Sequence, residues 1–587
     1  MLPLLLLTPS APAPQSTPPS SFFSVSAPAN GRASFVTPTG KPFWSFGACC
    51  VDRGTPKDKY NLANPSYHAW GLFKDDQTWA KDSVSKLKSW GFNTLGGWSD
   101  YQVLTQLPTK QQMPFTVVLH LGAYYRAPWD DLFSAEARKA IFDAAKAQIE
   151  PVRNDPNLIG YFSDNELGWW DDTLFLSYVE KLPPNSPGRK AAHATIRDLY
   201  GSFKNFQTDW ITTSTSWEDF ANKPSLKLRP GRRGMRAVNA WMSKVGSHYY
   251  RTVHDAIRTC DKRHLILGDR YAQYYNIALA KSSAPWINVS STNMGADWTD
   301  GTFSHFYLDT LNKITHKPVL ITEFYICAME NRSGNKNSSA GFPTVQTQRQ
   351  RADAFGINVR GLGKLPFVIG AHWFQYTDEP THGRGDGENF NMGLLDIHGE
   401  PYHEITQAAK EAMAPQFALR PIPLAAKSGT IASVLFNPLK TGSIKSWPKE
   451  KSLVLPASGD AFADLHVVQD KRAIYVSLYA MDFADVSIYE KRQMPESERC
   501  HWQLTLGTKK VSVRFAGQTP AGKTLPVKVH GNGVAAVEKP GLKHTVILRI
   551  PKNILGVNGK ALKLSSTLSS HSRAETMGWR RTLRLSR

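Results

Sequence analysis

Eight short apolar runs, separated by longer amphipathic stretches, place the tightest limit on how this chain can fold. The runs are rich in β-branched and aromatic residues, as strands buried on both faces are. The stretches between them, such as 75–90, 135–152 and 347–362, carry apolar residues at helical spacing. Repeated strand–helix units of this kind predict an α/β fold, a (β/α)8 TIM barrel over residues 31–412. The apolar runs are residues 42–48, 92–97, 115–121, 158–163, 264–269, 287–292, 318–323 and 367–373.

Segments of different composition flank and interrupt the predicted barrel. Residues 1–30 are rich in Pro, Ser and Ala behind an apolar start, which predicts a signal peptide, a disordered segment and a secreted or periplasmic protein. An insertion at about 167–263 carries helical patterns, and we expect it to form a lid or a cleft wall. Five prolines mark 413–455 as a linker, and alternating apolar and polar residues within 456–587 predict a β-sandwich-like C-terminal domain.

Charge and cysteine content exclude several classes of protein. The chain has 70 Lys and Arg against 49 Asp and Glu, a formal net charge of +21, but its basic residues form no long run and no zinc-finger spacing. We therefore expect a basic surface and no nucleic-acid partner. Five Cys without a C-x-x-C pair indicate neither a disulfide scaffold nor a zinc site. Without an apolar run of about 18 residues, no membrane span is expected.

Two glutamates follow apolar runs at positions where a barrel carries its reactive groups. Glu166 comes just after the fourth run and Glu323 ends the seventh, so both are expected at the carboxyl ends of opposed strands. Glycoside hydrolysis needs such a pair, one carboxyl to protonate the leaving oxygen and one to attack the anomeric carbon. A separation of about 5 Å would give retention of configuration. A single strand-end Glu is more often part of an ion pair, but two on opposed strands favour catalysis.

Further polar and aromatic residues near strand ends are candidates for binding a sugar. Asn165 precedes Glu166, and its amide is expected to hold a sugar hydroxyl beside the reacting carbon. Trp373 is expected to form a sugar platform at the rim, where a Gly-rich loop follows the last run; the alternative for this loop is a turn stabilised by Asp and Asn side chains. The other candidates are Trp98, His120, Arg270, Asn293, Tyr325, Gln375, Glu388 and Asn389.

Several separated motifs together resemble family 50 of the clan A glycoside hydrolases, the β-agarases. They are Cys-Val-Asp-Arg-Gly at 50–54, Phe-Asn-Thr-Leu-Gly-Gly-Trp-Ser-Asp at 92–100, Tyr-Phe-Ser-Asp-Asn-Glu-Leu-Gly-Trp at 161–169, Leu-Ile-Thr-Glu-Phe at 320–324, His-Trp-Phe-Gln-Tyr-Thr-Asp at 372–378 and Asp-Gly-Glu-Asn-Phe-Asn at 386–391. The resemblance implies that Glu166 is the acid/base, that Glu323 is the nucleophile and that Asn165 holds the sugar. It also implies hydrolysis of β-galactosidic bonds, as in agarose, without a cofactor or a metal.

The C-terminal module weakly resembles family 9 carbohydrate-binding modules, through residues 470–476, Asp482, residues 550–556 and Trp579. A structural β-sandwich without a sugar site is an equal alternative. For the whole chain, the alternatives are a β-galactosidase or other β-glycosidase, a non-catalytic polysaccharide-binding protein, and, from charge alone, a protein for a polyanion. The basic surface also suits an enzyme that meets a sulfated or uronic substrate. The sequence leaves open the galactan, endo or exo action and the oligomeric state.

Overall fold

A computed structural model gives the arrangement of most of the chain. The structure describes residues 21–29, 31–169, 171–294, 296–338, 342–412, 430–434, 437–441, 444, 447, 462–481, 486–515, 525–539, 544–555, 561–570 and 575–585. The predicted signal segment at 1–20 lies outside them, as does 413–429 of the predicted linker.

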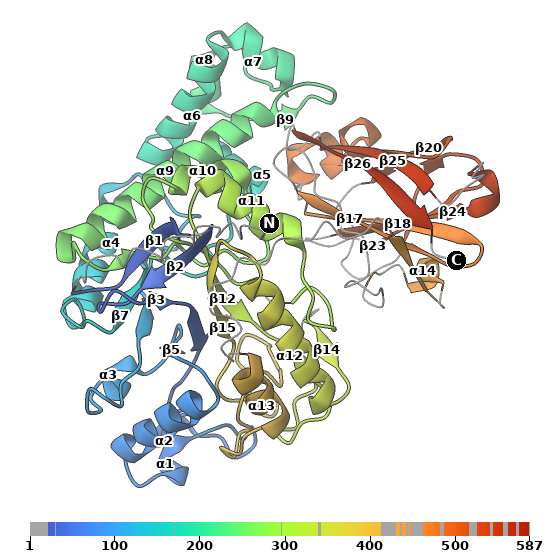
Figure 1. The fold of residues 1–587 in the computed structure, drawn as a ribbon. Helices are drawn as coiled ribbons and strands as arrows, with labels where there is room; N and C mark the ends of the chain where they lie inside the picture. Colours follow the sequence, from blue (N-terminus) through green and yellow to red (C-terminus); the bar gives the residue numbers. More distant parts are fainter. Residues whose placement is uncertain are drawn as a thin grey trace, which may run out of the picture.

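Eight parallel strands form the barrel at the centre of the larger domain (Figure 1). Their order is β10-β7-β6-β5-β4-β15-β12-β11, and an isolated parallel bridge joins Tyr271, in the segment after β10, to Thr292 of β11. Seven strands fall within one of the eight apolar runs and β12 extends one residue beyond its run, so the predicted (β/α)8 barrel is confirmed. The strands are β4 (Ser45–Ala48), β5 (Thr94–Leu95), β6 (Phe115–Val118), β7 (Leu158–Phe162), β10 (Leu265–Ile266), β11 (Ser290–Thr292), β12 (Val319–Phe324) and β15 (Val368–Trp373).

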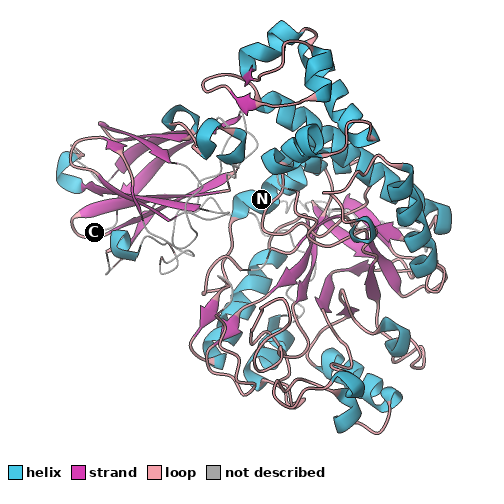
Figure 2. Ribbon diagram, turned by 180° about the vertical axis from the view of Figure 1, so that it is seen from behind, coloured by secondary structure: helices cyan, strands magenta, loops and turns pink. Residues whose placement is uncertain are grey.

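Helices surround these strands, as the view from behind shows (Figure 2). Side-chain caps fix where several of them begin. Asp75 accepts a hydrogen bond from the Thr78 amide at the start of α2, and Thr347 forms a capping box with Gln350 at the start of α12. The helices that follow the eight strands in turn are α2 (Asp76–Ser89), α3 (Tyr101–Leu104), α4 (Ala135–Ile149), α9 (Met235–Cys260), α10 (Ile277–Ser283), α11 (His305–Thr315), α12 (Gln348–Gly363) and α13 (His403–Ala412).

A small N-terminal sheet seals the end of the barrel opposite the strands' carboxyl ends. It consists of β1 (Ser24–Ala29), β2 (Arg32–Val36) and β3 (Pro42–Phe43). Phe23 and Phe35 are buried in one cluster with barrel-interior side chains such as Ile159 and Leu320. The expected disorder up to residue 30 is therefore wrong for Ser24–Ala29, because apolar burial beneath the barrel offsets the cost of ordering them.

The insertion supplies the barrel's fourth outer helix and an outward extension. Its 26-residue helix α9 packs against α4 and α10. The remainder, α6 (Pro187–Tyr200), α7 (Phe203–Asp209), α8 (Trp217–Asn222) and β9 (Lys227–Leu228), projects away from the barrel at the top of Figure 1. In the described part of this region, α9 buries an apolar face that holds it on the barrel wall, which differs from the lid that was one of the two expectations; the other, a cleft wall, stays a prediction.

The C-terminal domain is the predicted β-sandwich. β16 (Thr430–Ser433) pairs in parallel with β17 on one side and with β26 on the other, and so links its two sheets. The expected linker at 413–455 therefore contains a strand of this domain. Apolar side chains of both sheets meet in one core, Val476 and Trp502 among them. The other strands are β17 (Ala463–Gln469), β18 (Ala473–Ala480), β19 (Cys500–Leu506), β20 (Lys509–Phe515), β21 (Leu525–Pro526), β22 (Val529–His530), β23 (Ala535–Lys539), β24 (His544–Pro551), β25 (Ala561–Ser570) and β26 (Glu575–Leu585).

Specific polar contacts fix the sandwich against the barrel. The Asp464 carboxylate of β17 accepts hydrogen bonds from the backbone amides of His305 and Phe306, at 2.8 and 3.2 Å, and so caps α11 from the other domain. The Tyr479 hydroxyl donates to Asp297 at 3.1 Å. Burial raises the pKa of Asp464 to about 8.

Among the helices described, none combines the length and the apolar character that crossing a bilayer requires.

We predict that replacing Phe35 by Ala destabilises the protein by about 3–5 kcal/mol, because its ring is fully buried at the base of the barrel. The free energy of unfolding from urea titration measures this. Leu62→Ala is the control, since Leu62 is 85% exposed and the change there should stay within about 0.5 kcal/mol. An equal, small effect of both substitutions would show that the N-terminal sheet does not stabilise the barrel.

A candidate active site at the barrel mouth

Glu166 and Glu323 line the same cavity at the carboxyl ends of the barrel strands. Glu323 lies within β12, and Glu166 follows β7 in a loop. The cavity has a volume of about 380 Å3, and its wall is formed by Cys50, Trp98, Asn165, Glu166, Glu323, Tyr325, Phe342, Phe374, Arg384, Asp386, Glu388 and Met392. The strand ends therefore bring together two carboxyl groups that are far apart in the sequence.

A chain of hydrogen bonds connects the two carboxyl groups beneath the cavity. The Arg270 guanidinium contacts Glu323 Oε1 at 2.6 Å and donates to Asn165 Oδ1 at 2.9 Å. The Asn293 amide donates to the same Asn165 oxygen at 2.8 Å and to Glu166 Oε1 at 3.0 Å. Thr322 donates to Asn293 Oδ1 at 2.7 Å, which fixes the orientation of that amide. Each carboxyl group is thus held by a donor from a different strand end.

Arg270 is a buried cation, and Glu323 is the carboxylate in direct contact with it. The Arg270 side chain has no exposed surface, and its guanidinium lies over the Trp98 ring, 4.2 Å from the ring centroid. Taking such a charge out of water is costly unless a paired anion and hydrogen bonds compensate it. The contact with Glu323 supplies that compensation and favours the ionised form of Glu323.

Burial raises the pKa of both carboxyl groups. For Glu323 the pKa rises to about 8, with the nearby Glu166 charge adding to the effect of burial and Arg270 opposing it. For Glu166 burial again raises the pKa, while the Asn293 hydrogen bond and the Arg270 charge oppose the rise. The direct guanidinium contact opposes the rise that burial causes in the pKa of Glu323, and so favours the ionised form of this carboxyl group.

Left-handed backbone conformations surround the mouth of the barrel. Cys50, Trp98, His120, Glu166 and Arg270 all have a positive φ, between 51° and 59°, and each follows a different barrel strand. For residues other than Gly this conformation is strained, and such residues gather where function requires a particular side-chain direction. The strain at five neighbouring strand ends marks this rim as the functional end of the barrel.

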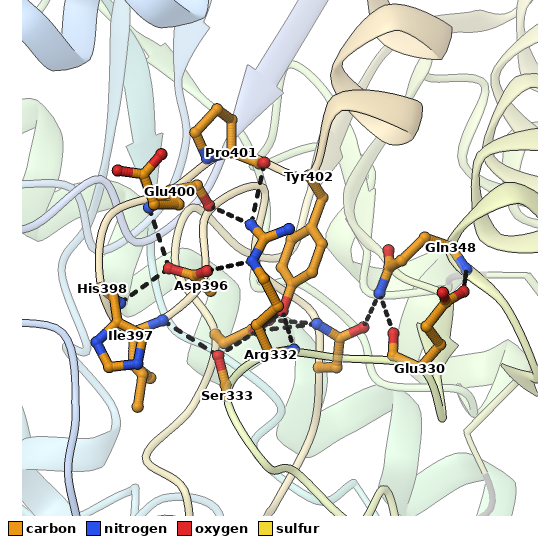
Figure 3. A network of polar contacts seen from close by, with 12 residues as sticks. Glu330, Arg332, Ser333, Gln348, Asp396, Ile397, His398, Glu400, Pro401 and Tyr402 are labelled. Atoms are coloured by element: carbon orange, nitrogen blue, oxygen red, sulfur yellow. Dashed lines mark hydrogen bonds and ion pairs between the residues drawn. The ribbon is translucent and has the colours of Figure 1, made fainter.

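A polar network, partly buried, holds the loops that form one side of the cavity. Arg332 contacts Asp396 at 2.5 Å and stacks on the Tyr402 ring at 4.3 Å, as Figure 3 shows. Asp378 accepts hydrogen bonds from the Ser333 and Tyr402 hydroxyls, both at 2.7 Å. The network ties the loop after β12 to the loop after β15. It therefore supports the segment that carries Arg384, Glu388 and Met392 into the cavity wall.

Arg384 contacts acidic side chains at the rim of the cavity. Its guanidinium donates to Asp386 at 2.8 Å and to Glu388 at 2.7 Å. The neighbouring Glu379 is buried, which raises its pKa to about 8 although the Arg384 charge opposes the rise. Rings of Trp98 and Phe374 face the same cavity. The cavity thus combines hydrogen-bonding groups with apolar surfaces, as sites for polyhydroxylated ligands do.

The structure brings together most of the residues singled out in the sequence. Asn165, Trp98, Tyr325 and Glu388 line the cavity with the two glutamates. Arg270 and Asn293 lie behind its surface and hold the carboxyl groups from there. His120 accepts a hydrogen bond from the Trp98 indole at 3.0 Å and so orients that ring. Their contributions to ligand binding remain predictions.

Besides Arg270, Asn293 and His120, three further candidate residues do not line the cavity. The predicted sugar platform at Trp373 is wrong, because its ring is fully buried between Phe324 and Phe355 and its indole donates to the Met392 carbonyl at 2.8 Å. Asn389 accepts hydrogen bonds from Asn335 and from the Lys336 amide, both at 3.1 Å, which is the turn-stabilising alternative. Gln375 is buried, and it is not among the cavity-lining residues.

Six lining residues were not singled out in the sequence. Phe374 follows Trp373 directly. Because successive side chains of a strand point to opposite faces, the sequence indicated that one of these two rings faces the cavity. Phe342 comes from the loop after β12, where no strand pattern indicates its position. The full set is Cys50, Phe342, Phe374, Arg384, Asp386 and Met392.

Comparisons with known proteins agree with this fold. No protein-family model matches the chain. Over 366 residues, 60% of this chain and 38% of the relative, it is 25% identical to β-agarase B of Vibrio sp. (strain JT0107). Over 372 residues, 57% of this chain and 36% of the relative, it is 28% identical to β-agarase A of the same organism. The chain thus spans little more than a third of the length of these curated relatives.

Solved structures with the same barrel include an agarase, AgWH50C, with a TM-score of 0.58 and 20% identity over 69% of this chain and 66% of the other. An exo-β-agarase gives a TM-score of 0.57 and 21% identity over 68% and 65% of the two chains. PfGH50B gives 0.58 and 20% over 70% and 67%. The resemblance to family 50 seen in the sequence motifs is confirmed by these similarities.

We predict that replacing Arg270 by Met raises the pKa of Glu323, because the guanidinium that opposes the effect of burial is lost. Carboxyl ¹³C chemical shifts of Glu-labelled protein, followed against pH, measure this. Arg349→Met, on the exposed face of α12, is the control and should leave the titration unchanged. An unchanged Glu323 titration in the Arg270 variant would contradict the assigned ion pair.

Proposed function

We propose that this protein is a retaining glycoside hydrolase that cleaves β-galactosidic linkages of a galactan such as agarose. One observation carries the proposal: Glu166 and Glu323, from well-separated barrel strands, line one cavity and are joined by the hydrogen bonds of Asn293, Asn165 and Arg270. The names of the curated relatives, both β-agarases, support the choice of substrate.

In the first step, a Glu323 carboxylate oxygen attacks the anomeric carbon. A bond forms between this oxygen and that carbon, the bond from the carbon to the leaving oxygen breaks, and Glu166 donates its proton to the leaving oxygen. Arg270 favours the ionised form of Glu323 before the attack, and Glu166, whose pKa is raised, enters this step protonated. The products of this step are a glycosyl-enzyme and a free sugar hydroxyl.

In the second step, the ionised Glu166 takes a proton from a water molecule. The water oxygen bonds to the anomeric carbon while the ester bond to Glu323 breaks, and Glu323 leaves as a carboxylate that again faces Arg270. Glu166 regains its proton, so the site returns to its starting state. Two inversions at the same carbon give net retention.

Asn165 is oriented to donate to the substrate. Its side-chain oxygen accepts hydrogen bonds from both Arg270 and Asn293, so the amide can lie in only one orientation. Within the described residues its NH2 group has no partner, which leaves it available to a sugar hydroxyl beside the anomeric carbon. The rings of Trp98, Tyr325 and Phe374 offer apolar surfaces to the C–H faces of neighbouring sugar units.

The proposed substrate is an extracellular polymer, so we also propose export of the protein. The apolar, Pro-, Ser- and Ala-rich segment at 1–30 supports a secreted or periplasmic location.

We predict that Glu323→Gln lowers kcat on agarose by about 10⁴-fold or more, because the uncharged amide cannot form the glycosyl-enzyme. Release of reducing ends measures turnover, and the thermal midpoint confirms folding. Glu136→Gln, which removes one acidic charge on an outer helix, serves as the control and should keep full activity. Near-normal turnover by the Glu323 variant would rule out its role as nucleophile.

We also predict that the first product released has the β configuration at its new reducing end. Proton NMR of the anomeric signals during the first minutes of hydrolysis distinguishes it from the α anomer before mutarotation. Initial formation of the α anomer would show a single displacement by water and would contradict the role given to Glu323.

A further inference from the structure

A second cavity lies where the insertion meets the C-terminal β-sandwich. Its volume is about 340 Å3, within the range of sites for small ligands. It forms where the segment between β9 and α9 approaches β19, β20, β25 and β26, and Figure 1 shows β9 next to the end of the sandwich that bears β26. The lining residues are Arg232, Arg233, Met235, Arg236, Ser497, Arg499, His501, Arg514, Ser569, Ser570 and Thr576.

The lining is strongly basic, with five arginines and no Asp or Glu. Among the described residues, these arginines make one ion pair, between Arg236 and Asp209 at 3.3 Å. Glu498 is adjacent in sequence, but one of its carboxylate oxygens accepts a hydrogen bond from the Gly231 amide at 2.6 Å. Arg499 also lies near enough to the buried Glu538 to oppose the rise in the pKa of that carboxyl group. Three of the five arginines, Arg232, Arg233 and Arg514, form no ion pair within the described part of the protein, so the cavity keeps an excess of positive charge.

The start of α9 adds to the positive potential. Met235 and Arg236 form its first turn and line the cavity. The helix is 26 residues long, and no side chain caps its first turn, which also lacks acidic residues. The amide groups at such an end carry a partial positive charge and attract anions. The guanidinium groups and the hydroxyls of Ser497 and Thr576 offer hydrogen-bond donors.

We propose that this cavity binds the sulfate ester groups of an anionic galactan. A sulfate ester presents three acceptor oxygens that share one charge, which suits several forked guanidinium donors better than the two oxygens of a carboxylate do. The cavity has no Phe, Tyr or Trp in its lining on which a nucleic-acid base could stack, and His501 is its one aromatic ring, so the donors match an isolated anionic group. The choice of a galactan rests on the proposed function, whereas the anion site does not.

The site would anchor the polymer and take no part in the chemistry. It shares no lining residue with the cavity that contains Glu166 and Glu323. A chain that is held at the sandwich and cleaved at the barrel mouth benefits from a raised local concentration at the second site. The five arginines of this cavity contribute to the net charge of +21, and the proposal gives them the function of binding the polymer.

Binding to a sulfated galactan tests the proposal. The probes are a sulfated galactan oligosaccharide, the same oligosaccharide after chemical desulfation and a short DNA duplex, each titrated calorimetrically into the Glu323→Gln protein. The double variant Arg232→Gln/Arg499→Gln should weaken binding of the sulfated probe at least tenfold and leave binding of the desulfated probe unchanged. Both arginines are exposed, so the fold should persist.

Arg138→Gln/Arg349→Gln is the matched control, since it removes two arginines from α4 and α12 and lowers the net charge equally. Equal losses in the two double variants, or no loss in either, would overturn the site. DNA binding as tight as that of the sulfated probe, with the same dependence on Arg232 and Arg499, would overturn the sugar assignment in favour of nucleic acid.

Hydrolysis separates this proposal from the proposed function. With Glu323 intact, the Arg232 and Arg499 variant should hydrolyse desulfated galactan with unchanged kcat/KM. If the wild-type protein hydrolyses no galactan and the difference in sulfate binding persists, the proposed function fails and the anion site stands. If hydrolysis proceeds and the binding difference is absent, the anion site fails alone.

Discussion

The contact between Arg270 and Glu323 is the interaction on which the arrangement of the barrel mouth depends. Both groups are buried, so each requires the other's charge, and removing one would leave an uncompensated charge in the protein interior. Arg270 also orients Asn165, and through it the amide of Asn293 that reaches Glu166. One guanidinium therefore sets the charge of one carboxyl group and, through shared hydrogen bonds, the position of the other.

Much of the barrel could be predicted because its strands are apolar on both faces and stand apart from the amphipathic helices. The ends of the strands were less predictable. β5 and β10 are only two residues long, and left-handed residues such as Trp98 and Arg270 follow them and turn the chain. A run of apolar residues indicates a buried strand, but it does not show where the backbone leaves the regular conformation.

The candidate site was predictable to the extent that strand ends converge. Glu166, Glu323 and Asn165 follow from that rule alone. Trp373 did not behave as expected, because a strand buried on both faces carries no polar side that would show which ring faces the cavity. Arg270 and Glu323 are 53 residues apart in the sequence and meet only in the folded barrel, so the sequence does not indicate that they form an ion pair.

The cap that Asp464 provides for α11 has a consequence for how the molecule behaves as a whole. Asp464 accepts hydrogen bonds from the backbone amides of His305 and Phe306, which lie about 160 positions earlier in the chain and in the other domain. The side chain of Ser304, the residue before α11, does not cap this helix. The sandwich thus completes a structural element of the barrel. A chain cut between the two domains would leave the start of α11 without this acceptor and expose the Asp464 side chain to solvent, so each half would lose the stabilisation that the shared cap provides.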